Sequence, residues 1–136
     1  MQNDKRFDDW QFPSIEEGKP TTYNWIVQNK SGLQLGYKTD IGAFTYINAK
    51  HVVRIEDFVQ IGSHCSIYSL STIDGKTGPV TLKKGCCLGS HSVVMPGVTI
   101  GKNAIVGAFS FVNINIPDNA VAFGIPVRVH RIMTKV

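Results

Sequence analysis

Two histidines, His64 and His91, stand at matching places in the sequence, three residues after Ile61 and Leu88. An imidazole that is neutral near pH 7 accepts a proton readily, so a histidine pointing outward at a turn is a candidate general base. Asp74 opens a turn-rich segment and is a third candidate, either as a base or as a partner that orients a histidine. Each residue also has an ordinary structural interpretation, as a surface imidazole bonded to a carbonyl or as a turn-forming aspartate.

Positive charge is concentrated in the second half of the chain. Residues 1–58 hold seven Lys/Arg and eight Asp/Glu, whereas residues 59–136 hold seven Lys/Arg and two Asp/Glu. The basic residues are scattered and not interleaved with aromatics, which favours an anionic small molecule over nucleic acid as a partner. The sequence shows no apolar run of the ~18 residues that a membrane span needs, no signal peptide and no Cys-x-x-Cys pair, so we expect a cytoplasmic protein without membrane insertion.

A period of six residues runs through the middle of the chain. Aliphatic residues recur at every sixth position: Leu82, Leu88, Val94, Ile100, Val106 and Val112. Four residues after each of the first five comes a small or slender residue: Cys86, Ser92, Val98, Ala104 and Ser110. Neither an α-helix nor an alternating strand gives this period, but a coil with three flat faces does. The sequence therefore predicts an all-β parallel β-helix with about 18 residues per coil.

The six-residue register extends back to Leu35 with two interruptions. The first interruption adds two residues between Ile47 and Ile55. After it, the register is predicted to run through four isoleucines: Ile55, Ile61, Ile67 and Ile73. The second interruption contains the cluster Asp-Gly-Lys-Thr-Gly-Pro, which predicts one loop projecting from the solenoid near residues 74–81. Loops that interrupt a solenoid often carry function.

We predict a single domain with three parts. Residues 1–32 lack the register and are rich in aromatics, so they are predicted to form an N-terminal cap, with a short strand near Tyr23–Gln28. A cap is needed because the open end of a β-helix exposes unpaired strand edges. The aromatics of this segment could also line an acceptor pocket, and both roles are compatible. Residues 33–117 form the coils, and residues 118–136 form a C-terminal tail.

At the level of motifs, the sequence resembles the hexapeptide-repeat acyltransferases. The residues that carry the resemblance are Leu-Gly-Ser-His-Ser-Val-Val-Met-Pro-Gly-Val-Thr-Ile-Gly at 88–101, Ile-Val-Gly-Ala-Phe-Ser-Phe-Val at 105–112, and the closing segment 116–131. This family includes galactoside, maltose and xenobiotic acetyltransferases. The sequence also resembles the N-acetyltransferases that act on nucleotide-linked amino sugars. The resemblance covers roughly residues 33–132. It implies left-handed coiling, a homotrimer, and acetyl-CoA in a groove between neighbouring subunits. From the spacing of the histidines and cysteines we expect no metal.

The resemblance also implies roles for individual residues. Eight positions match those at the CoA site: Gly89, Ser90, Gly107, Ala108, Ser110, Pro126, Arg128 and Arg131. Arginine suits the CoA phosphates because its guanidinium bonds two oxygens at once. His64 matches a position that faces the acceptor, so we place the base there ahead of His91 and Asp74.

The sequence departs from the galactoside-type enzymes in one respect. Those enzymes carry a histidine in the projecting loop, whereas the corresponding segment from Ser69 to Lys76 contains none. An amine needs less help from a base than a hydroxyl does. The missing histidine therefore favours N-acetylation. The small size and the shortened loop favour a nucleotide-linked amino sugar as the acceptor, in surface-glycan (lipopolysaccharide) biosynthesis. O-acetylation of a sugar hydroxyl is the alternative.

Two other functions of a β-helix fit less well. The γ-type carbonic anhydrases bind zinc through a close pair of histidines, whereas His64 and His91 are well separated in the sequence and no close pair exists. A non-catalytic, ice-binding-like β-helix needs a regular array of outward residues on one face. Here the outward positions are irregular: Lys83, Met95, Lys102, Phe109 and Asn113.

Overall fold

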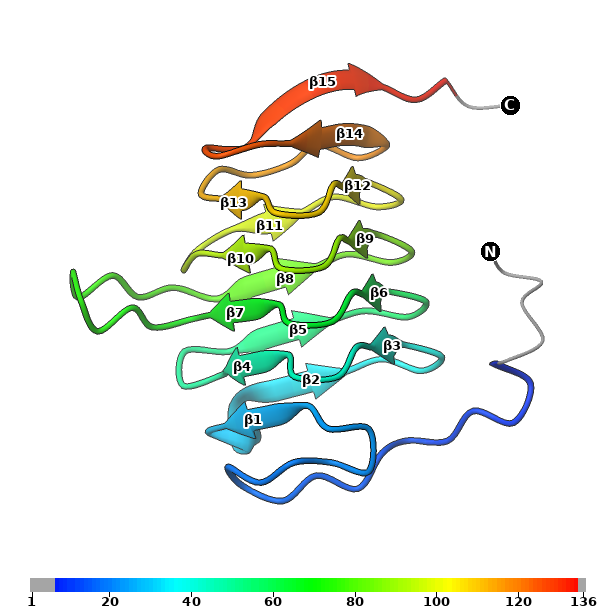
Figure 1. The fold of residues 1–136 in the computed structure, drawn as a ribbon, viewed down its shortest axis with the longest axis vertical. Coiled ribbons are helices and arrows are strands. Elements are labelled where there is room, and N and C mark those ends of the chain that lie inside the picture. Colours follow the sequence, from blue (N-terminus) through cyan, green and yellow to red (C-terminus); the bar gives the residue numbers. More distant parts are fainter. Residues whose placement is uncertain (1–6, 135–136) are drawn as a thin grey trace.

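The structure, a computed structural model, describes residues 7–134 of the chain. The parts of the predicted cap and tail at residues 1–6 and 135–136 lie outside this range. Three narrow sheets form the walls of a three-sided prism, and successive coils stack along its axis (Figure 1). This is the parallel β-helix that the six-residue period predicts.

Each sheet takes one strand from nearly every coil. Sheet A contains β1 (Ile26–Gln28), β4 (Tyr46–Asn48), β7 (Ser66–Tyr68), β10 (Val93–Val94) and β13 (Phe111–Val112). Sheet B contains β2 (Leu33–Leu35), β5 (Val53–Ile55), β8 (Val80–Leu82) and β11 (Thr99–Ile100). Sheet C contains β3 (Asp40–Ile41), β6 (Gln60–Ile61), β9 (Cys87–Leu88), β12 (Ile105–Val106), β14 (Ala120–Phe123) and β15 (Arg128–Ile132), of which β15 runs antiparallel to β14. The 3₁₀ turn η2 (Lys30–Gly32) lies between β1 and β2, and within residues 7–134 no helix is long and apolar enough to cross a bilayer.

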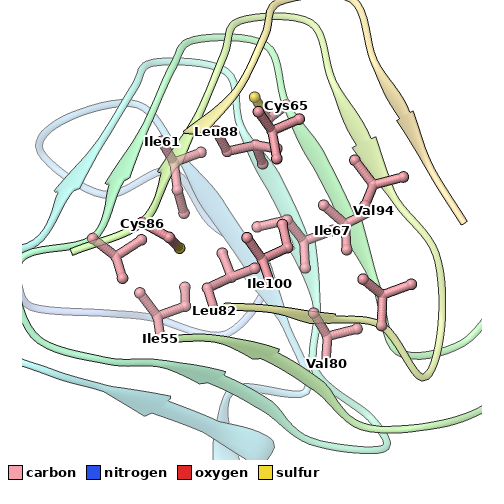
Figure 2. Packing of buried hydrophobic residues seen from close by; sticks show 14 of the residues in the cluster. Ile55, Ile61, Cys65, Ile67, Val80, Leu82, Cys86, Leu88, Val94 and Ile100 are labelled. Atoms are coloured by element: carbon pink, nitrogen blue, oxygen red, sulfur yellow. The ribbon is translucent and has the colours of Figure 1, made fainter. Parts of the chain in front are cut away.

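The predicted inward positions of the regular stretch form the core. Its aliphatic residues are at most 2% exposed: Leu82, Leu88, Val94, Ile100, Val106 and Val112. Its slender residues are at most 3% exposed: Cys86, Ser92, Val98, Ala104 and Ser110. Figure 2 shows side chains from the walls meeting in the interior of the prism. Burial of one aliphatic side chain of this size stabilises a protein by about 1.5–3 kcal/mol, so the repeat explains the stacking of the coils.

The length of a coil changes at both predicted interruptions and also between β1 and β2, before the predicted register begins. Tyr46 pairs with Ile26 in one neighbouring coil and with Ser66 in the other, and both steps are slightly longer than a regular coil. Val93 pairs with Ser66 across the long loop, and with Phe111 across a coil of regular length. The extra residues therefore lie outside the three walls, at the corner that joins sheets A and B. The strands of each sheet stay in register.

The projecting loop begins earlier than the sequence predicts. The prediction that Ile73 continues the inward register is wrong, because its side chain is 98% exposed. Ser69 is the last buried residue before the loop, and the next wall begins with β8 at residue 80. Leu70 bridges antiparallel to Thr77, so the segment folds on itself as a small hairpin and leaves the solenoid before residue 74 (Figure 1).

The three corners of the prism are named here by the sheets that they join. At the C–A corner, one residue in each coil has a positive φ between 59° and 66°: Phe44, His64, His91 and Phe109. At the B–C corner, one residue in each coil has a positive φ between 52° and 73°: Lys38, Phe58, Gly85, Asn103 and Asn119. The long loop lies at the A–B corner.

Candidate functional site

The two candidate histidines lie one above the other at the C–A corner. The ring centroids of His64 and His91 are 4.7 Å apart, and the rings are 4° from parallel. Phe44 extends the stack on one side, 5.1 Å from His64, and Phe109 extends it on the other, 4.9 Å from His91. We call these four exposed residues the aromatic column. In the described part of the chain, no group of three or more His, Cys, Asp or Glu residues is placed to hold a metal ion.

The register of the coils produces this column. The backbone N–H of His64 donates to the carbonyl of Ala43 at 2.9 Å, and that of His91 donates to the carbonyl of Ser63 at 3.0 Å. Phe109 continues the same pattern one coil further on. Because every column residue has the same left-handed backbone conformation, the side chains leave the corner in the same direction at the strand spacing of ~4.8 Å.

The inward residues of the same corner fix its turns. The Cys65 thiol donates to the carbonyl of Gly89 at 3.2 Å, and burial raises the pKa of this thiol. The Ser110 hydroxyl donates to the carbonyl of Gly107 at 2.6 Å and accepts the N–H of Gly124 at 3.2 Å. Ser110, predicted at the CoA site, therefore faces the core, where it joins the corner to the tail.

Backbone amides form a second ladder beside the column. Ser90 and Ala108 directly precede His91 and Phe109, and among residues 7–134 their N–H groups donate to no protein acceptor. Glycine allows this close stacking, since a Cβ on Gly89 would lie 2.4 Å from the Ala108 nitrogen. An extended ligand that carries amide carbonyls, such as the pantetheine arm of CoA, fits these donors.

The two arginines of the tail lie on the same face of strand β15. Arg128 pairs with Phe123, whereas Arg131 pairs with Val121, because the register shifts between Val121 and Ala122. Residues two apart on β14 point to one face of the sheet, and paired residues share that face. In a regular strand, residues 128 and 131 would point to opposite faces. The β-bulge therefore gathers the two positive charges.

The tail packs against the end of the aromatic column. A Cβ on Gly107 would lie 2.9 Å from the Phe123 Cβ. The N–H of Phe111 donates to the carbonyl of Gly124 at 3.0 Å, and that of Val127 donates to the carbonyl of Phe111 at 2.9 Å. These contacts place four of the residues predicted at the CoA site at the C–A corner (Gly89, Ser90, Gly107 and Ala108) and Arg128 beside it, whereas Arg131 lies further along β14 toward the B–C corner.

Asp74 lies apart from the column in the single chain. It sits in the loop between β7 and β8, at the A–B corner (Figure 1). Its Oδ1 accepts the Lys76 N–H at 3.2 Å, and its Oδ2 lies 3.8 Å from the Lys76 Nζ. Hydrogen bonds from the Ser71 side chain and the Lys76 amide lower the pKa of Asp74. A carboxylate stabilised in this way is a weaker proton acceptor, so these contacts favour the turn-forming role.

Sequence reasoning did not single out Phe44 and Phe109 as parts of the site. Phe44 follows the inward Ile41 by three residues, and Phe109 follows the inward Val106 by three. This is the same offset that identifies both histidines. Aligning that offset across all coils would have predicted the whole column.

Comparison with known sequence families identifies this repeat. Residues 79–113 match the family described as bacterial transferase hexapeptide (six repeats). Residues 79–113 therefore carry the repeat of this family. The chain is 33% identical over 111 residues to the galactoside O-acetyltransferase of Lactococcus lactis subsp. lactis (strain IL1403), in an alignment that covers 71% of this chain and 54% of the relative. The chain thus spans about half the length of this curated relative.

Solved structures of hexapeptide-repeat acyltransferases share the fold. A galactoside acetyltransferase in complex with coenzyme A aligns with a TM-score of 0.70 and 29% identity, over 81% of this chain and 60% of that chain. A variant of AntD, an N-acyltransferase from Bacillus cereus, was solved with dTDP-4-amino-4,6-dideoxyglucose and coenzyme A. It aligns with a TM-score of 0.58 and 26% identity, over 82% of this chain and 72% of that chain. The predicted resemblance to hexapeptide-repeat acyltransferases is confirmed.

Proposed function

We propose that this protein is an acetyl-CoA-dependent acyltransferase that acetylates the amino group of a nucleotide-linked sugar. The aromatic column carries the proposal. It holds two exposed imidazoles: His91 directly follows Ser90 in the chain, and His64 stacks on His91. One corner thus offers both proton acceptors and a binding ladder for the CoA arm.

The proposed reaction is a direct transfer. The neutral acceptor amine attacks the thioester carbonyl, so that a C–N bond forms and the C–S bond breaks. The proton lost by the amine passes to the imidazole of His64, and the CoA sulfur leaves as a thiolate that takes up a proton from solvent. His91 adjoins Ser90 and lies between His64 and Phe109 in the stack, so we assign it to the CoA side of the reaction.

The tail supplies the charge that CoA requires. Arg128 and Arg131 share an exposed face, and Phe123, which pairs with Arg128, packs on Gly107 at the end of the column. Charge-assisted hydrogen bonds from a guanidinium are strong and geometrically specific for phosphate. We assign these arginines to the CoA phosphates, with Pro126 in the adjoining turn.

We also propose that the protein assembles as a homotrimer through sheet A. Its outward row runs through Ile26, Tyr46, Ser66, Val93 and Phe111, which pair in register. No strand of this sheet contains a charged residue, unlike β5 of sheet B and β15 of sheet C. In such an assembly a neighbouring subunit would complete the groove at the C–A corner. A solution mass equal to one chain at micromolar concentration would contradict the assembly.

The acceptor is assigned from the loop and from the relatives. The loop between β7 and β8 has no histidine, which favours an amine over a hydroxyl acceptor, and AntD is an N-acyltransferase whose structure holds an amino-sugar nucleotide. A product of this kind would serve surface-glycan biosynthesis. O-acetylation of a galactoside is a second candidate, because the curated relative with 33% identity is a galactoside O-acetyltransferase.

An acceptor panel tests the proposal. The purified chain is incubated with acetyl-CoA and, separately, with dTDP-4-amino-4,6-dideoxyglucose, dTDP-glucose and a galactoside. Thiol release and the product mass are then measured. Acetylation of the amine-bearing acceptor alone is expected. Acetylation of the galactoside alone would favour the second candidate, and no thiol release with any acceptor would refute an acetyltransferase that uses these acceptors.

A further inference from the structure

A cavity of about 230 Å³ lies at the N-terminal end of the prism, away from the residues assigned to CoA. It is formed between the segment that precedes β1 and the first strand of sheet C. Its walls combine aromatic rings with carboxylates, chiefly Trp10, Tyr23, Trp25, Asp9 and Asp40. Both tryptophans of the chain line it.

Specific contacts hold the walls together. The indole Nε1–H of Trp10 donates to the carbonyl of Thr39 at 2.8 Å, next to β3, the edge strand of sheet C. Trp25 is 2% exposed, and its carbonyl accepts the N–H of Thr21 at 2.9 Å. The segment therefore covers the edge of the solenoid, as expected of a cap, and still leaves a space beneath it.

The cavity is close to Phe44, the residue at the N-terminal end of the aromatic column. Ile41, which lines it, lies three residues before Phe44, whose ring is 5.1 Å from His64. The strand that contains Ile41 pairs directly with β6, and β6 leads into the turn that holds His64. A ligand that protrudes from the cavity along this corner would approach the proposed base.

The size and chemistry of the cavity favour a sugar ring. Sites for drug-sized ligands measure about 300–1,000 Å³, so this smaller space suits one six-membered ring and not a whole nucleotide sugar. Aromatic faces pack against the C–H groups of a pyranose, and carboxylates accept hydrogen bonds from its hydroxyls. The Asp9 carboxylate would repel a diphosphate, which orients the nucleotide out of the cavity.

We infer that this cavity binds the sugar ring of the acceptor and directs its amino group toward His64. This inference rests on the proposed function and adds the place where the acceptor is recognised. It also gives the aromatic residues of the cap a role in substrate binding in addition to their structural role.

Intrinsic fluorescence tests the inference without relying on catalysis. Because both tryptophans line the cavity, titration of the whole chain with dTDP-4-amino-4,6-dideoxyglucose should change the emission in a saturable way. Titration with dTDP should leave the emission unchanged. An equal response to dTDP would place the nucleotide in the cavity and overturn the inference, as would no response to either in a chain that acetylates the sugar.

Asp9→Asn provides the kinetic test, and Asp8→Asn is its matched control. Both aspartates are exposed, but only Asp9 lines the cavity. Asp9→Asn should raise the KM for the acceptor about tenfold, the size expected when a hydrogen bond to a charged group is weakened. It should leave the KM for acetyl-CoA unchanged, and Asp8→Asn should change neither value. Equal effects of the two substitutions, or an effect on acetyl-CoA alone, would contradict the inference.

The two proposals fail in different ways. If the protein is no acetyltransferase, thiol release is absent with every acceptor, and titration with free glucosamine still tests the cavity for sugar binding through fluorescence. If only the inference is wrong, the wild-type chain acetylates the acceptor, and Asp9→Asn retains the wild-type KM.

Discussion

The C–A and B–C corners share one backbone turn but carry different side chains. Each has a residue with positive φ in every coil. The upper coils of the B–C corner fill that place with Gly85, Asn103 and Asn119, the residue types that tolerate a left-handed backbone. The C–A corner instead uses His, which like Asn is enriched at positive φ, and Phe, which is uncommon there.

The difference shows that backbone preference does not explain the two phenylalanines of the C–A corner. A left-handed conformation costs a bulky residue about 1–3 kcal/mol, whereas one aromatic contact returns only ~0.5–1.5 kcal/mol. Stacking therefore offsets the cost in part. The B–C corner shows that the same turn can be built without this cost, so the column residues fit a role in ligand binding and catalysis. Lys38 and Phe58 are the exceptions at the B–C corner, and Phe58 packs against Tyr37 with ring centroids 5.2 Å apart.

The largest effect is expected from His64→Asn. Asparagine tolerates positive φ, so the fold should persist while kcat falls by about 10²–10⁴-fold, the range for a lost general base. The KM for acetyl-CoA should change little. His91→Asn should instead raise the KM for acetyl-CoA. Phe58→Asn, which makes a matching change at the B–C corner, should leave both constants unaltered. Steady-state kinetics with retained kcat in His64→Asn and lost kcat in His91→Asn would reverse the two assignments.

The next effect concerns the tail at the end of the C–A corner. Replacing Arg128 and Arg131 together by alanine should raise the KM for acetyl-CoA about tenfold or more, because each charge-assisted contact is worth roughly 1.5–3 kcal/mol. The wild-type KM should rise with salt, and that of the double variant should not. Lys102→Ala, beside the B–C corner, is the control for the removal of positive charge. An unaltered KM at low salt would remove both arginines from the site.

A smaller effect is expected on the free energy of unfolding when a positive-φ residue is replaced at either corner. Asn103→Ala should destabilise the fold by about 1 kcal/mol, since alanine is strained at a φ of 57°. Phe109→Asn should have little effect, because relief of strain offsets the lost stacking against His91. Urea unfolding at one fixed protein concentration measures both variants. A large loss of stability in Phe109→Asn would make the column a structural element first.

The smallest effect is an alkaline loss of stability from buried thiols. Burial raises the pKa of Cys86, which lies inward at the B–C corner, above its ordinary value of 9.0. The unfolded thiol ionises above this pH while the folded thiol keeps its proton, so the free energy of unfolding should fall as pH rises past about 9. Cys65, inward at the C–A corner, also has a raised pKa, but hydrogen bonds from the Ser92 and His91 amides oppose the effect of burial.

Thermal melting between pH 8 and 10.5 checks this difference between corners. Cys86→Ala should flatten the alkaline decline more than Cys65→Ala, because hydrogen bonds partly offset the cost of ionising Cys65. The same decline in both variants as in the wild type would assign the effect to other groups.

The sequence alone determined the solenoid. Each wall needs one inward aliphatic residue and one slender residue every six positions, and this pattern predicted the buried side chains from residue 82 to 112. It also predicted the turn-like place of both histidines, since a fixed offset from an inward residue fixes the position in the coil. The pattern failed at Ile73, where a residue of suitable type lies at a suitable spacing but belongs to a hairpin that has left the wall.

Only the tertiary structure decided which side chains meet. The stacking of His64 on His91 joins residues of two different coils. It depends on the length of the loop that projects from the A–B corner between them. The shared face of Arg128 and Arg131 depends on a bulge that no spacing rule showed. The cavity beneath the first coil depends on how the preceding segment docks on the edge of sheet C. The six-residue period predicts whether a side chain points inward or outward within its own coil. Contacts between residues of different coils depend on the length and path of the chain that connects these coils.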